Sequence, residues 1–117
     1  MSAILCHTTA PNKDVAHTIA NHLLTERLAA CVSILGPASS LYHWNQAIET
    51  AEEYTLTIKT VEMHIDSLTA AIQTYHPYEI PEIVWTKPVL VESKYAAWIE
   101  TSVSKKDTQL DKSLAPK

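Results

Sequence analysis

The sequence predicts one α+β domain with the split βαββαβ arrangement, an antiparallel sheet carrying two helices on one face and a further helix at its C-terminal end. The 117 residues are 46% hydrophobic and 19% charged, which is typical of one globular domain. Apolar residues recur every second position in some segments and every three to four positions in others. These segments follow one another as strand, helix, strand, strand, helix, strand and helix, and this order predicts the arrangement.

Residues 2–36 predict the first strand, the first helix and the second strand. Residues 2–8, SAILCHT, are short, apolar and partly β-branched, which favours a buried strand. Helical spacing follows over residues 13–26, and Asn12 can cap this helix. Residues 31–36, CVSILG, predict the second strand, and we expect the dipeptide Gly36-Pro37 to end it.

Residues 40–60 predict two long strand segments joined by a solvated turn at the acidic sequence ETAEE, residues 49–53. In the second segment Tyr54, Leu56 and Ile58 alternate with polar residues, as expected for a strand with two different faces.

The second half of the chain predicts two more helices and one strand. Helical spacing begins at Val61 and ends at Tyr75, because His76 precedes Pro77 and the α conformation is disfavoured there. Residues 82–86, EIVWT, predict the last strand, and residues 93–103 predict a helix capped by Ser93. We expect residues 1–103 to form the domain and residues 104–117 to be a disordered tail.

Charge and composition exclude several function classes. The net charge is −4 and Arg27 is the lone arginine, so a nucleic-acid-binding surface is not expected. The single glycine, Gly36, excludes the phosphate-binding loops built on repeated glycines. No signal peptide or membrane-spanning segment is predicted, and Cys6 and Cys31 are expected to be buried thiols, a disulfide being the alternative. We therefore expect a soluble, cytoplasmic protein.

A sheet with helices on one face leaves its other face bare. Tyr42, Trp44 and Tyr54 lie on the long strand segments and need a cover, and the simplest cover is another copy of the chain. We expect these three residues to lie in the interface of a homo-oligomer.

Several segments together resemble the CutA family, the divalent-cation tolerance proteins. They are TTAPNKDVA, LLTERLAACVSI, SLYHWNQAIETAEEY, LTIKT, YHPYEIPEIV and YAAWI, which occur in this order between about residue 3 and residue 103. The resemblance implies a ferredoxin-like fold and a tight homotrimer similar to the PII signalling proteins. It also implies a link to copper and divalent-metal tolerance, with no enzymatic reaction.

The resemblance implies a metal site at His76 and Glu82, which match the last histidine and the glutamate of the copper-binding members. Tyr75 replaces a second histidine, and Thr8 or Thr9 stands at the position of the family's cysteine ligand. Without a thiolate, the remaining imidazole and carboxylate suit copper(II) or another divalent cation, weakly bound.

Other readings of these residues remain open. His76 could instead cap the carbonyl groups at the end of its helix. Tyr78, Glu79, Lys59 and Glu53 are expected to line the intersubunit cleft, where Lys59 could bind an anion; Lys59 and Glu53 could equally be an exposed pair without function. The alternative function is a PII-like trimer that binds a nucleotide or other anion and reports to a partner protein. An enzyme using His76 and Glu82 lacks a recognisable nucleophile or oxyanion donors.

Overall fold

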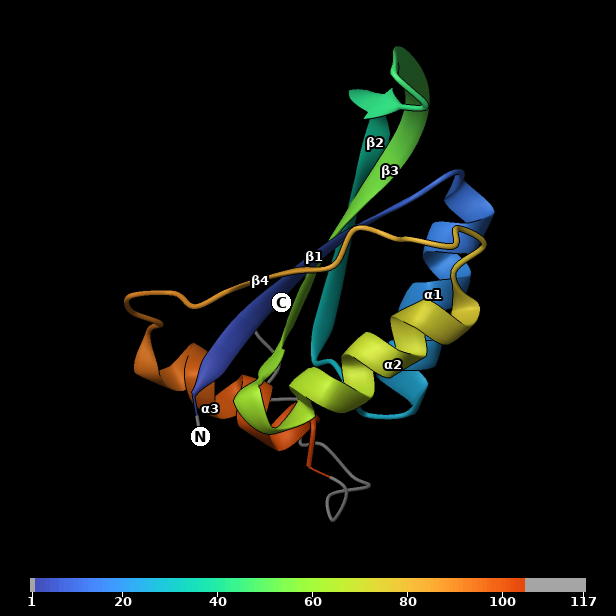
Figure 1. Ribbon diagram of the computed structural model, residues 1–117. Coiled ribbons are helices and arrows are strands. Elements are labelled where there is room, and N and C mark those ends of the chain that lie inside the picture. Colours follow the sequence, from blue (N-terminus) through green and yellow to red (C-terminus); the bar gives the residue numbers. More distant parts are fainter. Residues whose placement is uncertain (1, 105–117) are drawn as a thin grey trace.

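The computed structural model describes residues 2–104, and the predicted tail lies outside these residues except for Ser104. The elements follow one another in the predicted order (Figure 1). They are β1 (Ala3–Ala10), α1 (Lys13–Thr25), β2 (Cys31–Trp44), β3 (Ala47–Val61), a 3-10 turn η1 (Glu62–His64), α2 (Ile65–Tyr75), β4 (Val84–Thr86) and α3 (Ser93–Ser102).

The four strands form one antiparallel sheet with the order β2-β3-β1-β4. Ala3 lies opposite Val61 and Ala10 opposite Tyr54 in the β1–β3 pair, while Leu5 lies opposite Thr86 in the β1–β4 pair. The predicted split βαββαβ arrangement is therefore confirmed.

α1 and α2 lie side by side on one face of the sheet (Figure 1) and build the main core. Ile19 and Leu23 of α1 and Leu68 and Ile72 of α2 are at most 1% exposed. They pack against the alternate residues of β1 and β3 that point to this face, which include Cys6, Leu56 and Ile58. The strict alternation in the second half of β3 thus marks the true core face.

The ends of both core helices follow from local chemistry. Asn12 caps α1 as predicted, because its side-chain oxygen accepts a hydrogen bond from the Val15 N–H at 2.9 Å. α2 ends at Tyr75, and His76 is extended with φ −86° and ψ 136°, as expected before Pro77. The predicted start of this helix at Val61 is wrong: β3 extends to Val61, which is fully buried under α3, and η1 separates it from α2.

α3 packs on the opposite face of the sheet from α1 and α2. Ile99 and Val103 form a second, smaller core with Val61, and Ala3 packs against it. The predicted cap at Ser93 is wrong, because the carboxylate of Glu92 accepts the N–H groups of Lys94 and Tyr95, both at 2.9 Å. A carboxylate at a helix N-terminus also interacts favourably with the helix dipole.

β2 and β3 form a long hairpin that projects beyond the rest of the domain (Figure 1). Trp44 lies opposite Ala47, so the turn consists of Asn45 and Gln46, whose φ angles of 49° and 63° are both positive. Positive φ at both central residues is the pattern of a two-residue hairpin turn, in which asparagine is favoured. The predicted turn at residues 49–53 is wrong, because these acidic residues lie within β3.

β2 also continues through the predicted stop at Gly36-Pro37. The β2–β3 register shifts between Leu35 and Ala38, so the dipeptide lies at an irregularity of the strand. β2 is an edge strand. A proline is tolerated on an edge or at a bulge, because no hydrogen bond to a neighbouring strand requires its missing N–H there. The two predicted segments, residues 31–36 and the strand beginning at residue 40, are therefore one strand.

Candidate functional site

His76 joins the end of α2 to the end of β1. Its side chain is 7% exposed, and Nε2 donates a hydrogen bond to the carbonyl oxygen of Thr9 at 2.6 Å. Nδ1 accepts a hydrogen bond from the Tyr78 N–H at 3.1 Å. Because Nδ1 accepts, the proton lies on Nε2, and both ring nitrogens are occupied within the chain.

Glu53 lies at the centre of the same group of residues. It is 8% exposed, and its Oε2 accepts hydrogen bonds from the hydroxyls of Thr9 and Tyr78, each at 3.2 Å. The rings of His76 and Tyr78 lie 4.7 Å apart at an angle of 50°. We call Thr9, Glu53, His76 and Tyr78 the Glu53 cluster. Its hydrogen bonds connect the loop after α2 to the part of β3 where the projecting hairpin begins.

The electrostatics of the cluster keep Tyr78 protonated. Burial raises the pKa of Tyr78 above its ordinary value of 10.0, and the charge of Glu53, its hydrogen bond and the nearby Tyr42 raise it further. Tyr78 therefore remains a donor to Glu53 at neutral pH, and Oε2 of Glu53 accepts hydrogen bonds from two hydroxyl groups.

The other predicted metal ligand makes no hydrogen bond to His76. Glu82 is exposed and makes no hydrogen bond or ion pair within residues 2–104, and the same holds for Glu79. Lys59 shares a face of β3 with Glu53, as predicted from the strand period. Its Nζ lies 5.9 Å from the ring centroid of Tyr95, near α3 and away from the Glu53 cluster.

The described part of the chain lacks a complete metal site. Nowhere in residues 2–104 do three or more His, Cys, Asp or Glu side chains gather closely enough to hold one ion. Cys6 and Cys31 are both free thiols, and burial raises the pKa of Cys6 to about 12. Cys6 therefore stays protonated, and a protonated thiol is a poor metal ligand. A divalent ion bound within residues 2–104 alone would have fewer than three such ligands.

The residues predicted to lie in the interface are not all on one face. Tyr42 and Trp44 are 43% and 55% exposed in the projecting part of the hairpin. They lie opposite Glu49 and Ala47, on the same face of the sheet as Glu53. Tyr54 points to the other face, where it packs against the main core.

Thr9 is the functional-site residue that the sequence analysis did not assign a role. Its carbonyl oxygen and hydroxyl connect His76 to Glu53, two residues that are far apart in the sequence. The available signal was its position at the end of the first strand, at or next to the position of the family's cysteine ligand. A role in linking these two side chains depends on the β1–β3 register, which local patterns do not reveal.

Known proteins of one family share both the sequence pattern and the fold of this chain. The family model "CutA1 divalent ion tolerance protein" matches residues 4–102. The Xylella fastidiosa CutA crystal structure is similar with a TM-score of 0.86 and 35% identity, covering 89% of this chain and 100% of that one. The fold is therefore the ferredoxin-like α+β fold of the CutA1 structures.

Two relatives are similar in sequence to this chain, and the share of their own length that the match spans differs between them. The Citrobacter koseri divalent-cation tolerance protein CutA is 33% identical over 86% of this chain and 85% of its own length. The rice chloroplastic protein CutA 1 is 34% identical over 86% of this chain, and the match spans 56% of its length. The Citrobacter relative is named for tolerance to divalent cations and not for a reaction. The chain belongs to the CutA1 divalent ion tolerance family.

Proposed function

We propose that this chain forms a homotrimer that binds a divalent metal ion, with copper(II) as the favoured ion, or a small effector in the clefts between its subunits. The observation that carries this proposal is the exposed apolar surface of the hairpin. Five large hydrophobic residues lie there, between 43% and 76% exposed: Leu35, Leu41, Tyr42, Trp44 and Ile48. Apolar surface of this kind marks an interaction site, and symmetric self-association is the commonest way to cover it.

The proposed metal site is centred on His76. Its resemblance to the histidine of the copper-binding members supports the assignment, and Thr9, at the position of the missing cysteine or next to it, contacts its ring. Both ring nitrogens already have hydrogen bonds, so a metal ion would have to replace one of them. Glu82 is free to take part because it is exposed. These features predict weak binding that requires a neighbouring subunit.

The role proposed for His76 is binding and not catalysis. A general base needs a nitrogen within reach of a substrate proton. The His76 nitrogens instead face the Thr9 carbonyl and the Tyr78 amide, and His76 itself is buried. Its geometry supports a non-enzymatic function.

Equilibrium dialysis of the native oligomer against copper(II) tests the metal site. We expect His76→Gln to lower copper uptake markedly, while His43→Gln, a change of an exposed histidine in the hairpin, leaves it unchanged. Circular dichroism establishes that both variants are folded. Equal affinity and stoichiometry in His76→Gln and the native protein would remove His76 as a ligand.

A PII-like regulator that binds a nucleotide or other anion is the second candidate. The observation that favours it is Lys59, whose ammonium group has no carboxylate partner within residues 2–104. A thermal-shift screen with divalent metals and nucleotides side by side separates the two functions, because the true ligand raises the melting temperature. A rise with nucleotides that Lys59→Gln abolishes would favour the regulator.

The proposed location is the cytoplasm, with no nucleic acid or membrane as partner. Free thiols at Cys6 and Cys31 suit a reducing compartment. Within residues 2–104, every helix is too short or too polar to cross a membrane. Cell fractionation followed by detection of the protein tests this location.

A further inference from the structure

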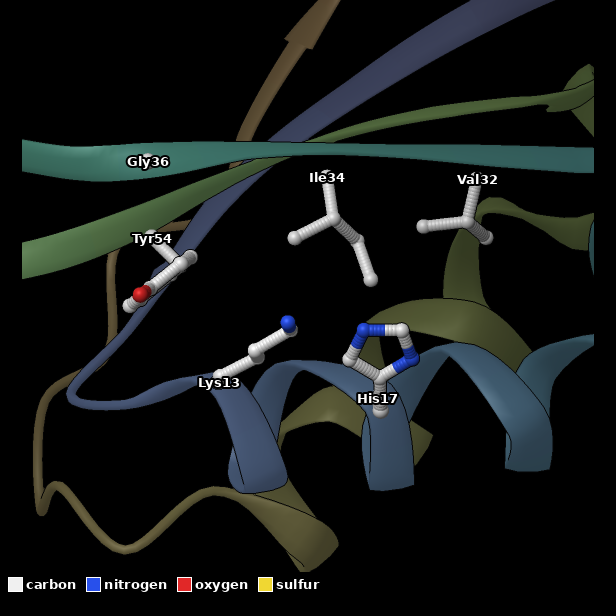
Figure 2. A pocket seen from close by; sticks show the side chains of 6 residues that line it. All are labelled: Lys13, His17, Val32, Ile34, Gly36 and Tyr54. Carbon is white, nitrogen blue, oxygen red and sulfur yellow. The ribbon is translucent and has the colours of Figure 1, made fainter.

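A half-open surface cavity of about 440 Å³ lies between α1 and the edge strand β2, on the helix-covered face of the sheet, and Lys13 and His17 at its rim are exposed. Six residues line it: Lys13, His17, Val32, Ile34, Gly36 and Tyr54. Figure 2 shows the side chains of Val32 and Ile34 extending from β2 toward Lys13 and His17 on α1, with the Tyr54 ring at one end. Its volume is within the range of small-molecule sites in proteins.

The sequence builds the apolar part of this cavity in a specific way. Val32 and Ile34 are two residues apart on β2, so both point to the helix face and form an aliphatic wall. A Cβ atom at Gly36 would lie 2.7 Å from Cδ2 of Tyr54, closer than such atoms approach. The single glycine of the chain therefore makes room for the Tyr54 ring at the end of the cavity.

The polar part of the cavity is basic. Lys13 and His17 are four residues apart on α1 and share one face of the helix. Neither side chain makes a hydrogen bond or ion pair within residues 2–104, and no acidic residue lines the cavity. An unpaired ammonium group beside an apolar wall favours an anion with an apolar body.

We propose that this cavity binds a small aromatic carboxylate. The carboxylate lies between Lys13 and His17, and the flat ring lies against Val32, Ile34 and Tyr54. This site is separate from the Glu53 cluster, because Tyr54 and Glu53 are consecutive residues of β3 and point to opposite faces of the sheet. It does not depend on metal binding at His76.

An NMR titration of the native, isotope-labelled oligomer with 1-naphthoate tests the proposal. We expect amide shifts that concentrate on residues 13–17, 32–36 and 54 at millimolar ligand. Lys13→Gln keeps the helix and removes one charge, and it should weaken binding about two- to fivefold, the size of one solvent-screened ion pair. Lys94→Gln on α3 is the matched control and should bind 1-naphthoate as the native protein does.

Two further probes separate the parts of the site. The neutral analogue 1-naphthalenemethanol and inorganic phosphate should both bind more weakly than 1-naphthoate. The alcohol lacks the negative charge that Lys13 and His17 attract, and phosphate lacks the ring that packs against Val32, Ile34 and Tyr54. The proposal is overturned if the alcohol binds as tightly as the carboxylate, or if phosphate matches it. Unchanged affinity in Lys13→Gln, or shifts located elsewhere, would also overturn it.

Discussion

The two halves of the β2–β3 hairpin both carry large apolar residues but have very different surroundings. Leu56 and Ile58, in the half within the domain, are at most 1% exposed beneath α1 and α2. Leu41 and Ile48, in the projecting half, are 67% and 70% exposed. Apolar residues occur in both halves, so the pattern of the strand does not reveal where the core of one copy ends.

The lengths of the elements explain this difference. A strand of 15 residues such as β3 is about 50 Å long, whereas a helix of 13 residues such as α1 is about 20 Å long. The helices can therefore cover less than half of β3, and the longest dimension of the domain is 50 Å. The helix-covered half is stabilised within one copy, whereas the large apolar residues of the projecting half are exposed in that copy.

The largest effect is expected from a leucine truncation in the covered half. Leu68→Ala removes a fully buried side chain from α2 and should lower the free energy of unfolding by about 3 kcal/mol. Leu41→Ala is the matched change in the projecting half and should alter the stability of the protomer by less than about 0.5 kcal/mol. Urea unfolding at protein concentrations low enough to dissociate the oligomer measures both, and equal losses would remove the contrast between the halves.

A change at the boundary between the halves should have the next largest effect. In Gly36→Ala the added methyl group meets Cδ2 and Cγ of the Tyr54 ring at 2.7 and 2.9 Å and the Glu53 carbonyl oxygen at 3.1 Å. None of these atoms is the end of a flexible chain, so we expect a loss of about 2 kcal/mol from overpacking. Thermal unfolding checks this, and a variant as stable as the native protein would show that the ring moves freely.

A smaller effect is expected from removing the side-chain cap at the N-terminus of α1, one of the two helices that cover the sheet. Asn12→Ala removes the acceptor for the Val15 N–H and should lower the free energy of unfolding by about 1 kcal/mol. Asn12→Asp keeps an acceptor and serves as the control. If both variants unfold at the same urea concentration, the side-chain cap does not stabilise the helix.

The smallest effect is expected from a change at Glu92, which caps the N-terminus of α3. Hydrogen bonds from the Lys94 and Tyr95 N–H groups hold the pKa of Glu92 below its ordinary value of 4.5. A lowered folded-state pKa means that its stabilising contribution is present above pH 4.5 and is lost as the pH falls through the folded value. The difference in urea midpoint between the native protein and Glu92→Gln should shrink over that range. A constant difference would contradict this role.

Much of the fold could be predicted because strands and helices differ in period. The predictions were wrong at positions whose backbone conformation depends on residues far away in the sequence. The hairpin turn at Asn45 and Gln46 lacks the glycine that usually marks such turns, and the acidic residues of β3 resemble a turn in composition. The bulge at Gly36-Pro37 also resembles a strand end unless the edge position of β2 is known.

The candidate site was predicted in part. His76, Tyr78 and Glu53 were all chosen from the sequence, and the structure brings them together through Thr9. Lys59 lies apart from them near Tyr95, because the strand period predicts the face of the sheet on which a residue lies and not the groups that it contacts. Glu82 makes no hydrogen bond to any of them. The basic cavity between α1 and β2 was missed, since it requires the distance between two elements.

The mass of the native protein in solution tests the central claim most directly. If the projecting half of the hairpin is completed by other copies, sedimentation equilibrium at micromolar concentration should give three times the 13.0 kDa chain mass. A well-folded monomer at that concentration would contradict the account, because the exposed residues of the hairpin would then have no cover and the shared clefts would not exist.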